Sequence, residues 1–467
     1  MKKLHFVGIG GIGMSGLAAM AKHLGWQVTG SDRGADRPEN QRIISALKNQ
    51  GIRIYPQDGS FAEAGLPDHI VYSTAIEEDN PDFIAAGSTP RMHRSELLGM
   101  LMSSLDGKET IAVTGSCGKS TVTAYLAEAL FNIGADPSLL NGALSKRFKS
   151  ENFAGNFHPG SGRYVVFEAD ESDKSLLNYD TDYAVILNIG TDHYSKEELA
   201  EVFGAFLKNV RKGAVVSDEV YESVKAHIPP GLPVSVFYTS SSAEEKFALE
   251  DYFVDNSSGN RIPTAVFSGG TVLKLPQSGR HTALNALAIS AMLQMLGFTP
   301  GAAISSLERF DGIFRRTDFA GKTRSGALVY DDYAHNPEKI ISCLDAMREL
   351  SDGRVLAVFQ PHGFGPLGFM RDALFEMLEK NLDPDDRFIM LEPYYAGGTT
   401  SFKPTSSSVI EDWKSRSPLP ELYLNFGDRG NLRDYLLAHA KKDDVIVIMG
   451  ARDNSLSDYA ASMVKNG

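Results

Sequence analysis

The sequence is poor in cysteine, with only Cys117 and Cys343 among its 467 residues. Two cysteines do not make the disulfide framework typical of small secreted domains, and they fit a protein of the reducing cytoplasm. A chain of this length is expected to form two to four domains, and it can bury several hydrophobic cores.

Long hydrophobic runs and an excess of positive charge are also absent. No apolar run approaches the ~18 residues that would span a bilayer. The first residues, 1–3, carry two lysines and precede an apolar stretch, as in a signal peptide, but the glycines from Gly8 to Gly13 interrupt that stretch. We therefore expect a cytoplasmic protein. The net charge of −13 and the pI near 5.4 argue against nucleic acid as its main partner.

A glycine-rich loop with the pattern G-x-G-x-x-G follows the apolar run 4–9. Glycines let the backbone approach phosphate oxygens, and the helix that follows offers unpaired N–H groups and a positive dipole end. The predicted diphosphate ligands are Gly8, Gly10, Gly11, Ile12 and Gly13. Taken alone, the loop favours NAD or FAD, with Asp32 on a ribose hydroxyl. The alternative is a tight turn that binds nothing.

A second loop, Gly115-Ser116-Cys117-Gly118-Lys119-Ser120, follows the apolar run 110–114. Its lysine can reach the β- and γ-phosphates of a nucleoside triphosphate, and its hydroxyl can bind Mg²⁺. The first glycine comes two residues late for the longer G-x-x-x-x-G-K-[ST] pattern, so a chance match is the alternative. A redox enzyme has no need of such a lysine. The two loops together indicate an enzyme that uses ATP on a nucleotide-linked substrate.

Short apolar runs alternate with helical patterns along the whole chain, which predicts an α/β protein with parallel sheets. The predicted domains are a Rossmann-like domain at 1–106, a central domain related to P-loop ATPases at 107–313 and a doubly wound domain at 314–467. The predicted strands are 4–9, 27–30, 52–55 and 70–73 in the first block, 110–114, 164–167 and 183–188 in the second, and 327–330, 355–359, 388–391 and 445–449 in the third.

Acidic and imidazole side chains follow the predicted strands of the second block. Glu168 follows the strand 164–167, and His193 comes soon after the strand 183–188. Ligands of α/β proteins bind at the carboxyl ends of strands, and Mg²⁺ prefers oxygen ligands. For a single carboxylate, a solvated turn is the better interpretation. For Glu168 and His193, which both come after buried strands, we favour a functional role.

The third block repeats this arrangement. Asp332 and His335 follow the strand 327–330, His362 follows 355–359, and Arg452 follows 445–449. We expect these side chains to converge on one cleft. Just before them, the pair 315–316 consists of two arginines, which could bind phosphate; an interdomain salt bridge is the alternative.

Eight motifs occur in the order that is typical of one family. They are GIGGIGMSG (8–16), TGSCGKST (114–121), EADESD (168–173), Asp-His (192–193), GRH…LNALA (279–288), F-x-G-x-x-R-R (310–316), DDYAH-x-P (331–337) and FQPH (359–362). Over essentially its whole length the chain resembles the Mur ligase family, the ATP-dependent ligases of peptidoglycan precursor synthesis. The resemblance is closest to the members that add L-alanine to UDP-N-acetylmuramate.

The resemblance implies three domains, for the UDP substrate, for ATP and for the amino acid. The first loop would then hold a UDP diphosphate rather than NAD. With ATP and Mg²⁺, such enzymes convert the carboxylate of UDP-N-acetylmuramate to an acyl phosphate, which the amine of a small amino acid attacks. Lys119 and Mg²⁺ would neutralise the charge on the transferring phosphoryl group.

The resemblance also assigns roles to individual residues. Catalysis falls to Lys119, Glu168, His193 and Asp332; ATP binding to Gly115, Gly118, Lys119, Ser120, Thr121, Asn285, Arg316 and Asp332; metal binding to Ser120, Glu168 and His193; and the UDP substrate to Gly8, Gly10, Gly11, Ile12, Gly13, Asp32 and Ser73. From their positions after strands of the third block, we assign the amino acid to His335, His362 and Arg452, with Arg371 as the alternative cation for its carboxylate.

Three departures from the family pattern concern the substrates. Thr282 replaces an asparagine, the uncharged loop 363–368 replaces a basic one, and residues 450–454 replace a glycine-acid pattern. Two further hypotheses stay open: a related ligase whose acceptor is a recycled peptide, and a UDP-sugar-binding protein without ligase activity. The intact Lys119 and Glu168 argue against the second of these.

Overall fold

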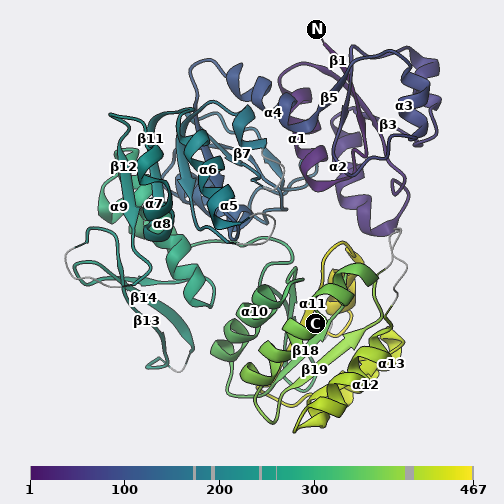
Figure 1. Ribbon diagram of the computed structural model, residues 1–467, viewed down its shortest axis with the longest axis vertical. Coiled ribbons are helices and arrows are strands. Elements are labelled where there is room, and N and C mark those ends of the chain that lie inside the picture. Colours follow the sequence, from purple (N-terminus) through teal and green to yellow (C-terminus); the bar gives the residue numbers. More distant parts are fainter. Residues whose placement is uncertain are drawn as a thin grey trace. The chain divides into compact units, whose positions relative to one another are not determined.

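The computed structural model describes residues 2–171, 175–190, 195–240, 245–258, 260–394 and 404–464. Its contacts divide the chain into two compact units (Figure 1). Unit 1 comprises Met1–Tyr252, Ala265–Pro276 and Ala283–Ile313, and unit 2 comprises Phe253–Thr264, Gln277–Thr282 and Phe314–Gly467. The chain is an α/β protein, as predicted. The three-domain division stays a prediction.

The first sheet of unit 1 is parallel and has the strand order β3-β2-β1-β4-β5. Its strands are β1 (Lys3–Val7), β2 (Gln27–Ser31), β3 (Arg53–Tyr55), β4 (His69–Tyr72) and β5 (Arg91–His93), and its helices are α1 (Ile12–His23), η1 (Pro38–Asn40), α2 (Gln41–Asn49), η2 (Ser60–Ala64), α3 (Pro81–Ala86) and α4 (Arg94–Ser103). The strand order reverses at β1, so the first loop lies where open α/β sheets bind ligands.

The second sheet of unit 1 has the order β12-β11-β10-β6-β9-β7-β8. Its strands are β6 (Glu109–Thr114), β7 (Ser138–Leu140), β8 (Phe157–His158), β9 (Tyr164–Glu168), β10 (Thr181–Ile186), β11 (Val210–Ser217) and β12 (Val234–Phe237). The helices near it in sequence are α5 (Lys119–Asn132), η3 (Ser175–Asn178), α6 (Lys196–Leu207), α7 (Asp218–Val224), η4 (Lys225–His227), α8 (Arg280–Met295) and α9 (Pro300–Leu307). A smaller sheet contains β13 (Leu249–Asp255), β14 (Ile262–Phe267) and β15 (Thr271–Lys274).

Strand β6, which precedes the second loop, is buried along its whole length. Ile111 and Val113 join a core with α5, whereas Ala112 joins the core on the opposite face. Successive side chains of a strand point to opposite faces, so a strand covered on both sides reads as a continuous apolar run. The core that contains Ala112 also contains Leu17 of α1 and Leu140 of β7. The first loop, which leads into α1, therefore lies beside the second sheet.

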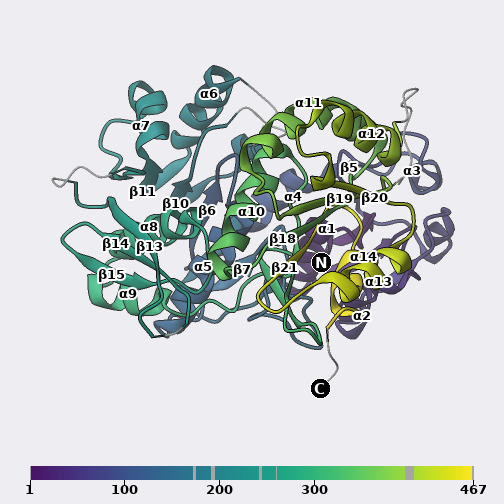
Figure 2. The same cartoon turned by 90° about the horizontal axis from the view of Figure 1, so that it is seen from below.

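The sheet of unit 2 has the order β16-β17-β21-β18-β19-β20 and is parallel except for the edge strand β16. Its strands are β16 (Asp318–Lys322), β17 (Leu328–Asp332), β18 (Val355–Phe359), β19 (Arg387–Leu391), β20 (Tyr423–Phe426) and β21 (Val445–Met449). Helices α10 (Pro337–Leu350), α11 (Phe364–Asn381) and α12 (Ser406–Arg416) cover one face, and α13 (Arg429–His439) and α14 (Ser455–Ala461) cover the other (Figure 2). A short helix, η5 (Pro420–Leu422), precedes β20.

One sequence prediction was wrong: residues 363–368 do not form a loop. Gly363 is the N-cap of α11, and the helix begins at Phe364. Pro366 stands in the first turn, where a missing N–H costs no helical hydrogen bond. Glycine and proline suggested a loop, but from Leu367 onward a buried apolar stripe holds the helix on the sheet.

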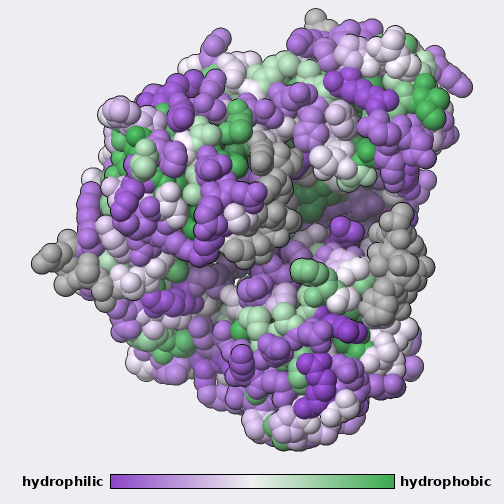
Figure 3. All heavy atoms as spheres, in the orientation of Figure 1, coloured by the Kyte–Doolittle hydropathy of each residue, from purple (hydrophilic) through white to green (hydrophobic). Residues whose placement is uncertain are grey.

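The predicted strands are present, with ends that differ by one or two residues. Among the described residues, no helix combines the length and the hydrophobicity needed to cross a membrane. On the face drawn in Figure 3, hydrophilic residues predominate and hydrophobic ones form small groups.

Candidate functional site

The first loop joins β1 to α1, and the neighbouring strand holds its backbone. The N–H groups of Gly8 and Ile9 donate to the carbonyl of Ser31 at 2.9 and 3.0 Å. Gly8 has a φ of +76°, a conformation that favours glycine. The N–H of Gly10 donates to Oδ2 of Asp32 at 2.8 Å. The loop is therefore preformed by contacts with β2 and the residue that follows it.

Asp32 is half-buried and hydrogen-bonded within the first unit. Its Oδ1 accepts from the N–H of Gly34 at 2.7 Å. A Cβ at Gly10 would lie 2.8 Å from Oδ2 of Asp32, which explains why the second glycine of the loop cannot be larger. Ser73, directly after β4, is also half-buried. Contacts of Asp32 and Ser73 with a UDP ligand stay predictions.

The second loop turns through two left-handed glycines, Gly115 with φ +134° and Gly118 with φ +85°. Gly118 is the N-cap of α5. The amide side chain of Asn188 fixes the loop: Oδ1 accepts from the N–H of Cys117 at 2.8 Å, and Nδ2 donates to its carbonyl at 3.0 Å. Asn188 was not predicted as a site residue, although it is the last residue of the predicted strand 183–188 and lies just after β10.

Lys119 begins α5, and its ammonium group lies in the second loop. Nζ donates to the carbonyl of Gly115 at 2.9 Å and pairs with Oε2 of Glu171 at 2.9 Å. Burial by itself lowers the pKa of Lys119, but the attraction of Glu171, Asp170 and Glu168 outweighs it, so the pKa is raised. The ammonium group therefore stays charged.

Glu168 is the last residue of β9 and lies next to the second loop, since it pairs in register with Val113 of β6. Its Oε2 accepts from the N–H of Gly142 at 2.8 Å. The carbonyl of Ser120 accepts from Nδ2 of Asn141 at 3.1 Å. His193 lies outside the described residues. In the part of the chain that is described, no group of three or more His, Cys, Asp or Glu residues forms a metal site.

Helix α8 contains the predicted ATP ligand Asn285 and Thr282, the residue that departs from the family pattern. Asn285 lies beside the second loop, because a Cβ at Gly118 would be 3.3 Å from its Oδ1. Thr282, which replaces the family's asparagine, is buried, and its hydroxyl donates to the carbonyl of Ser278 at 3.0 Å. Thr282 therefore supports the start of the helix.

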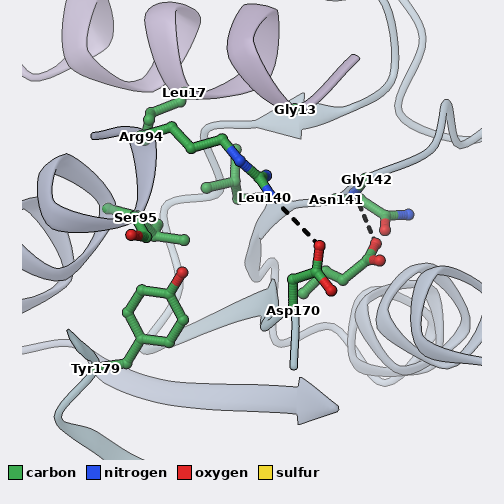
Figure 4. A pocket seen from close by; sticks show the side chains of 11 residues that line it. Gly13, Leu17, Arg94, Ser95, Leu140, Asn141, Gly142, Asp170 and Tyr179 are labelled. Carbon is green, nitrogen blue, oxygen red and sulfur yellow. Dashed lines mark hydrogen bonds and ion pairs between the residues drawn. The ribbon is translucent and has the colours of Figure 1, made fainter. Parts of the chain in front are cut away.

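A pocket of about 220 Å³ lies within unit 1, between the start of α1 and the end of β9 (Figure 4). Gly13 of the first loop lines one side, and Asn141 and Glu168 line another. Arg94 and Asp170 point toward each other across it, with Nη2 and Oδ2 3.3 Å apart. Arg94 was not predicted from the sequence. The feature that could have identified it is a cation in the first turn of a helix, where the macrodipole disfavours positive charge.

Of the two consecutive arginines, Arg315 has a structural role. It is 6% exposed, its Nε lies 3.3 Å from Oδ1 of Asp331, and its other nitrogens donate to the carbonyls of Asp453 and Gly450. Arg316 is half-buried, with its guanidinium 5.0 Å from the ring centre of Tyr333. Arg316 remains the candidate for a phosphate contact.

Asp332 ends β17, and backbone groups fix both of its carboxylate oxygens. Oδ1 accepts from the N–H of Ala334 at 2.8 Å, and Oδ2 accepts from the N–H of Thr317 at 2.6 Å. Asp332 is 8% exposed. The carboxylate is thus held rigidly at the carboxyl end of its strand, where the sequence predicted a functional group.

The predicted amino-acid ligands of unit 2 come together. The rings of His335 and His362 meet edge-on with centroids 5.2 Å apart. Burial lowers the pKa of His335 to about 4 and also lowers the pKa of His362, so both rings are neutral near pH 7. Arg452 is exposed, with φ +67°, and its N–H donates to Oη of Tyr333 at 3.3 Å. Tyr333, inside the DDYAH motif, was not predicted.

Three family models match the chain in succession. The Mur ligase family catalytic domain matches residues 3–105, the Mur ligase middle domain residues 113–293, and the Mur ligase glutamate ligase domain residues 315–452. A UDP-N-acetylmuramate–L-alanine ligase from Dictyoglomus turgidum is 32% identical over 462 residues, covering 96% of this chain and 94% of the relative. The enzyme of the same name from Rhizobium meliloti is 33% identical over 478 residues, covering 99% and 96%.

Solved structures agree with these sequence matches. The UDP-N-acetylmuramate–alanine ligase of Thermotoga maritima superposes with a TM-score of 0.79 at 25% identity, over 99% of this chain and 98% of that one. A murein peptide ligase from Psychrobacter arcticus, at 22% identity and a TM-score of 0.67, shares the fold over 100% of both chains. Nearly full-length identity above 30% and three consecutive domain matches show that this chain belongs to the Mur ligase family.

Proposed function

We propose that this protein is an ATP-dependent ligase that joins L-alanine, or another small amino acid, to the carboxylate of UDP-N-acetylmuramate in peptidoglycan precursor synthesis. One observation carries the proposal. The pocket of unit 1 is lined by Gly13 of the first phosphate loop and by Asn141 and Glu168, which adjoin the second. A nucleotide-linked acid on the first loop can therefore reach a phosphate held by the second.

In this proposal the first loop binds the UDP diphosphate and the second binds ATP. The Lys119 ammonium group, charged and directed into its loop, stabilises the transferring phosphoryl group. Transfer of the γ-phosphoryl group of ATP to the substrate carboxylate gives an acyl phosphate and releases ADP. The amine of the amino acid attacks this carbonyl, an amide bond forms, and phosphate leaves.

Mg²⁺ fits the residues present beside the second loop. Glu168 offers a half-buried carboxylate that a single backbone N–H of Gly142 orients, and Ser120 brings a hydroxyl to the first turn of α5. These are the hard oxygen ligands that the ion prefers, and it would neutralise phosphate charge there. His193 is proposed as a further ligand.

The proposed domains are residues 1–106 for the UDP substrate, 107–313 for ATP and 314–467 for the amino acid. The start of the last main segment of unit 2 at Phe314 supports the second boundary. His335, His362 and Arg452 form the proposed amino-acid site. Residues 363–368 at the start of α11 contain no charged side chain, which favours a small neutral amino acid.

Phosphate release measured with ATP and UDP-N-acetylmuramate tests the proposal. L-alanine, glycine and L-serine should each be compared with pooled peptides as acceptors. UDP-N-acetylglucosamine, which lacks the lactyl carboxylate, is the matched control and should give no release. Release with peptides alone would instead assign a peptide acceptor, and absence of release with every acceptor would leave a UDP-sugar-binding protein.

The metal assignment predicts that Glu168→Ala raises the Mg²⁺ concentration needed for half-maximal activity, because the ion loses a carboxylate ligand. Glu197→Ala, at an exposed position on α6, is the matched control. Saturation of both variants at the parent's Mg²⁺ concentration would show that Glu168 does not bind the metal.

The amino-acid site predicts that Arg452→Ala raises the KM for the amino acid roughly tenfold, while the KM for ATP changes little. A charge-assisted contact with a carboxylate typically contributes about 1.5–3 kcal/mol. Arg371→Ala is the control, since that side chain already lies 3.5 Å from Asp372 on α11. An unchanged KM in Arg452→Ala, or a preference for a charged amino acid, would contradict this site.

A further inference from the structure

Arg94 occupies a position that helix stability does not explain. It is the first residue of α4, and that helix is already capped by the reciprocal hydrogen bonds of His93 and Glu96. A cation at the N-terminus of a helix opposes the macrodipole. The guanidinium also lies against the first loop, because a Cβ at Gly13 would be 3.3 Å from its Nη1. The side chain therefore borders the start of α1 at a cost to its own helix.

Arg94 lies opposite a carboxylate in the pocket (Figure 4). Nη2 lies 3.3 Å from Oδ2 of Asp170, and each side chain is 33% exposed. Ion pairs exposed to this extent contribute little to stability. A ligand carboxylate can therefore replace that of Asp170 at little cost in free energy. It would bind the guanidinium group in the same way as Asp170 does.

The pocket has an apolar wall and a polar path. Leu17, Leu98 and Leu140 form the wall. The polar part of the lining includes Arg94, Asp170 and Glu168, and Glu168 lies beside the second loop. A ligand whose diphosphate lies at the first loop and whose acid group is to receive a phosphate would therefore occupy the pocket that Arg94 lines.

Resting on the function proposed above, we propose that Arg94 binds the carboxylate of the UDP-linked acid, and that Asp170 holds the guanidinium until the substrate carboxylate replaces it. Arg94 is then a specificity-determining residue, because it distinguishes an acidic UDP-sugar from a neutral one. Asp170 is a positioning residue that competes with the substrate for the same cation.

Two ligands separate the carboxylate from the diphosphate. UDP-N-acetylmuramate and UDP-N-acetylglucosamine share the uridine, the diphosphate and the amino sugar, and only the first carries a carboxylate. Their dissociation constants are measured by calorimetry without ATP or Mg²⁺. Arg94→Gln should weaken binding of UDP-N-acetylmuramate about tenfold and leave UDP-N-acetylglucosamine unchanged. Arg91→Gln removes the same charge from a side chain that pairs with Glu78 at the surface, and it should change neither constant.

Asp170→Asn gives the opposite result, which a purely structural role would not produce. The variant removes the competing carboxylate, so UDP-N-acetylmuramate should bind several-fold more tightly, with UDP-N-acetylglucosamine again unchanged. Arg94→Lys keeps the charge without the paired N–H groups, and it should fall between the parent and Arg94→Gln. It also gives the same ligand comparison if the glutamine variant does not fold.

Several outcomes would overturn the proposal. Equal losses for both ligands in Arg94→Gln would assign the side chain to the diphosphate, and unchanged affinities would remove it from the site. Weaker binding in Asp170→Asn would exclude a competing role for that carboxylate. If the parent protein binds no UDP-N-acetylmuramate, the proposed function itself is wrong, and this result is separate from any effect of the variants.

Discussion

The two glycine-rich loops that are proposed to bind phosphate have the same architecture and opposite electrostatics. Each leaves the carboxyl end of an interior strand, β1 or β6, and leads into the N-terminus of a helix. In the first loop, the carboxylate of Asp32 accepts a hydrogen bond from the N–H of Gly10 at 2.8 Å. In the second, the Lys119 ammonium group donates to the loop's own carbonyl at 2.9 Å.

This difference corresponds to what each loop is proposed to do. A diphosphate that is carried but not transferred needs only backbone N–H groups and the end of a helix dipole. A phosphoryl group in transfer develops charge that must be neutralised by fixed cations. The first loop therefore contains no cation of its own, and the nearby Arg94 comes from α4. In the second loop the cation is part of the motif.

The largest expected effect comes from removing that cation. Lys119→Ala should lower kcat roughly a thousandfold, the loss typical of a preorganised group that stabilises transition-state charge, or about 4 kcal/mol. Calorimetry should find UDP-N-acetylmuramate binding within about twofold of the parent, because the substrate occupies the other loop. An equal loss of UDP-substrate binding would show that the two loops do not divide the work.

The second comparison concerns α1 and α5, the helices that follow the two loops in the chain. Helix α1 has no acidic residue, whereas α5 carries Glu128, which is 1% exposed and accepts from the N–H of Asp311 at 2.8 Å. Burial raises the pKa of Glu128 from its ordinary 4.5 to about 7, despite that hydrogen bond. In this pH range the folded protein keeps a proton on Glu128 that the unfolded chain releases. The contribution of this carboxyl group to the free energy of unfolding therefore falls as the pH rises from about 4.5 to about 7.

Glu128→Gln should remove this dependence. The free energy of unfolding of the variant, relative to the parent, should rise between pH 5 and pH 8 by up to about 3 kcal/mol. Urea unfolding at several pH values measures the difference, and Glu197→Gln on the exposed face of α6 is the control. A difference that does not change with pH would show that Glu128 is ionised in the folded protein throughout this range.

The smallest effect concerns the first loop. A Cβ at Gly10 would lie 2.8 Å from Oδ2 of Asp32, so Gly10→Ala must displace the carboxylate that holds the loop. We expect the KM for UDP-N-acetylmuramate to rise roughly tenfold, or about 1.4 kcal/mol, with the KM for ATP unchanged. Gly301→Ala, where a Cβ would meet nothing within 4 Å, is the control. A rise in the KM for ATP as well would show that the loops are not independent.

Local patterns were enough to predict both loops and the main parallel strands, because glycine spacing and apolar runs report backbone conformation and burial directly. They were not enough for residues 363–368, where glycine and proline suggested a loop and the structure has the first turn of α11. They also did not predict the interior strand β11, the strands β5, β7, β8, β12 and β20, the edge strand β16 or the small sheet of β13, β14 and β15. Short edge strands with mixed exposure have no continuous apolar run to reveal them.

The sequence by itself determined the α/β class, the two loops and the strand ends that bear Glu168 and Asp332, because each depends on neighbours in the chain. The tertiary structure decided which side chains meet. It separated Arg315, bound to Asp331, from Arg316, and it brought Arg94 to Asp170 and Asn188 to Cys117. These pairs join residues 16, 76 and 71 positions apart. Their geometry is set by sheet order and helix packing, which bring together segments that the local sequence treats separately.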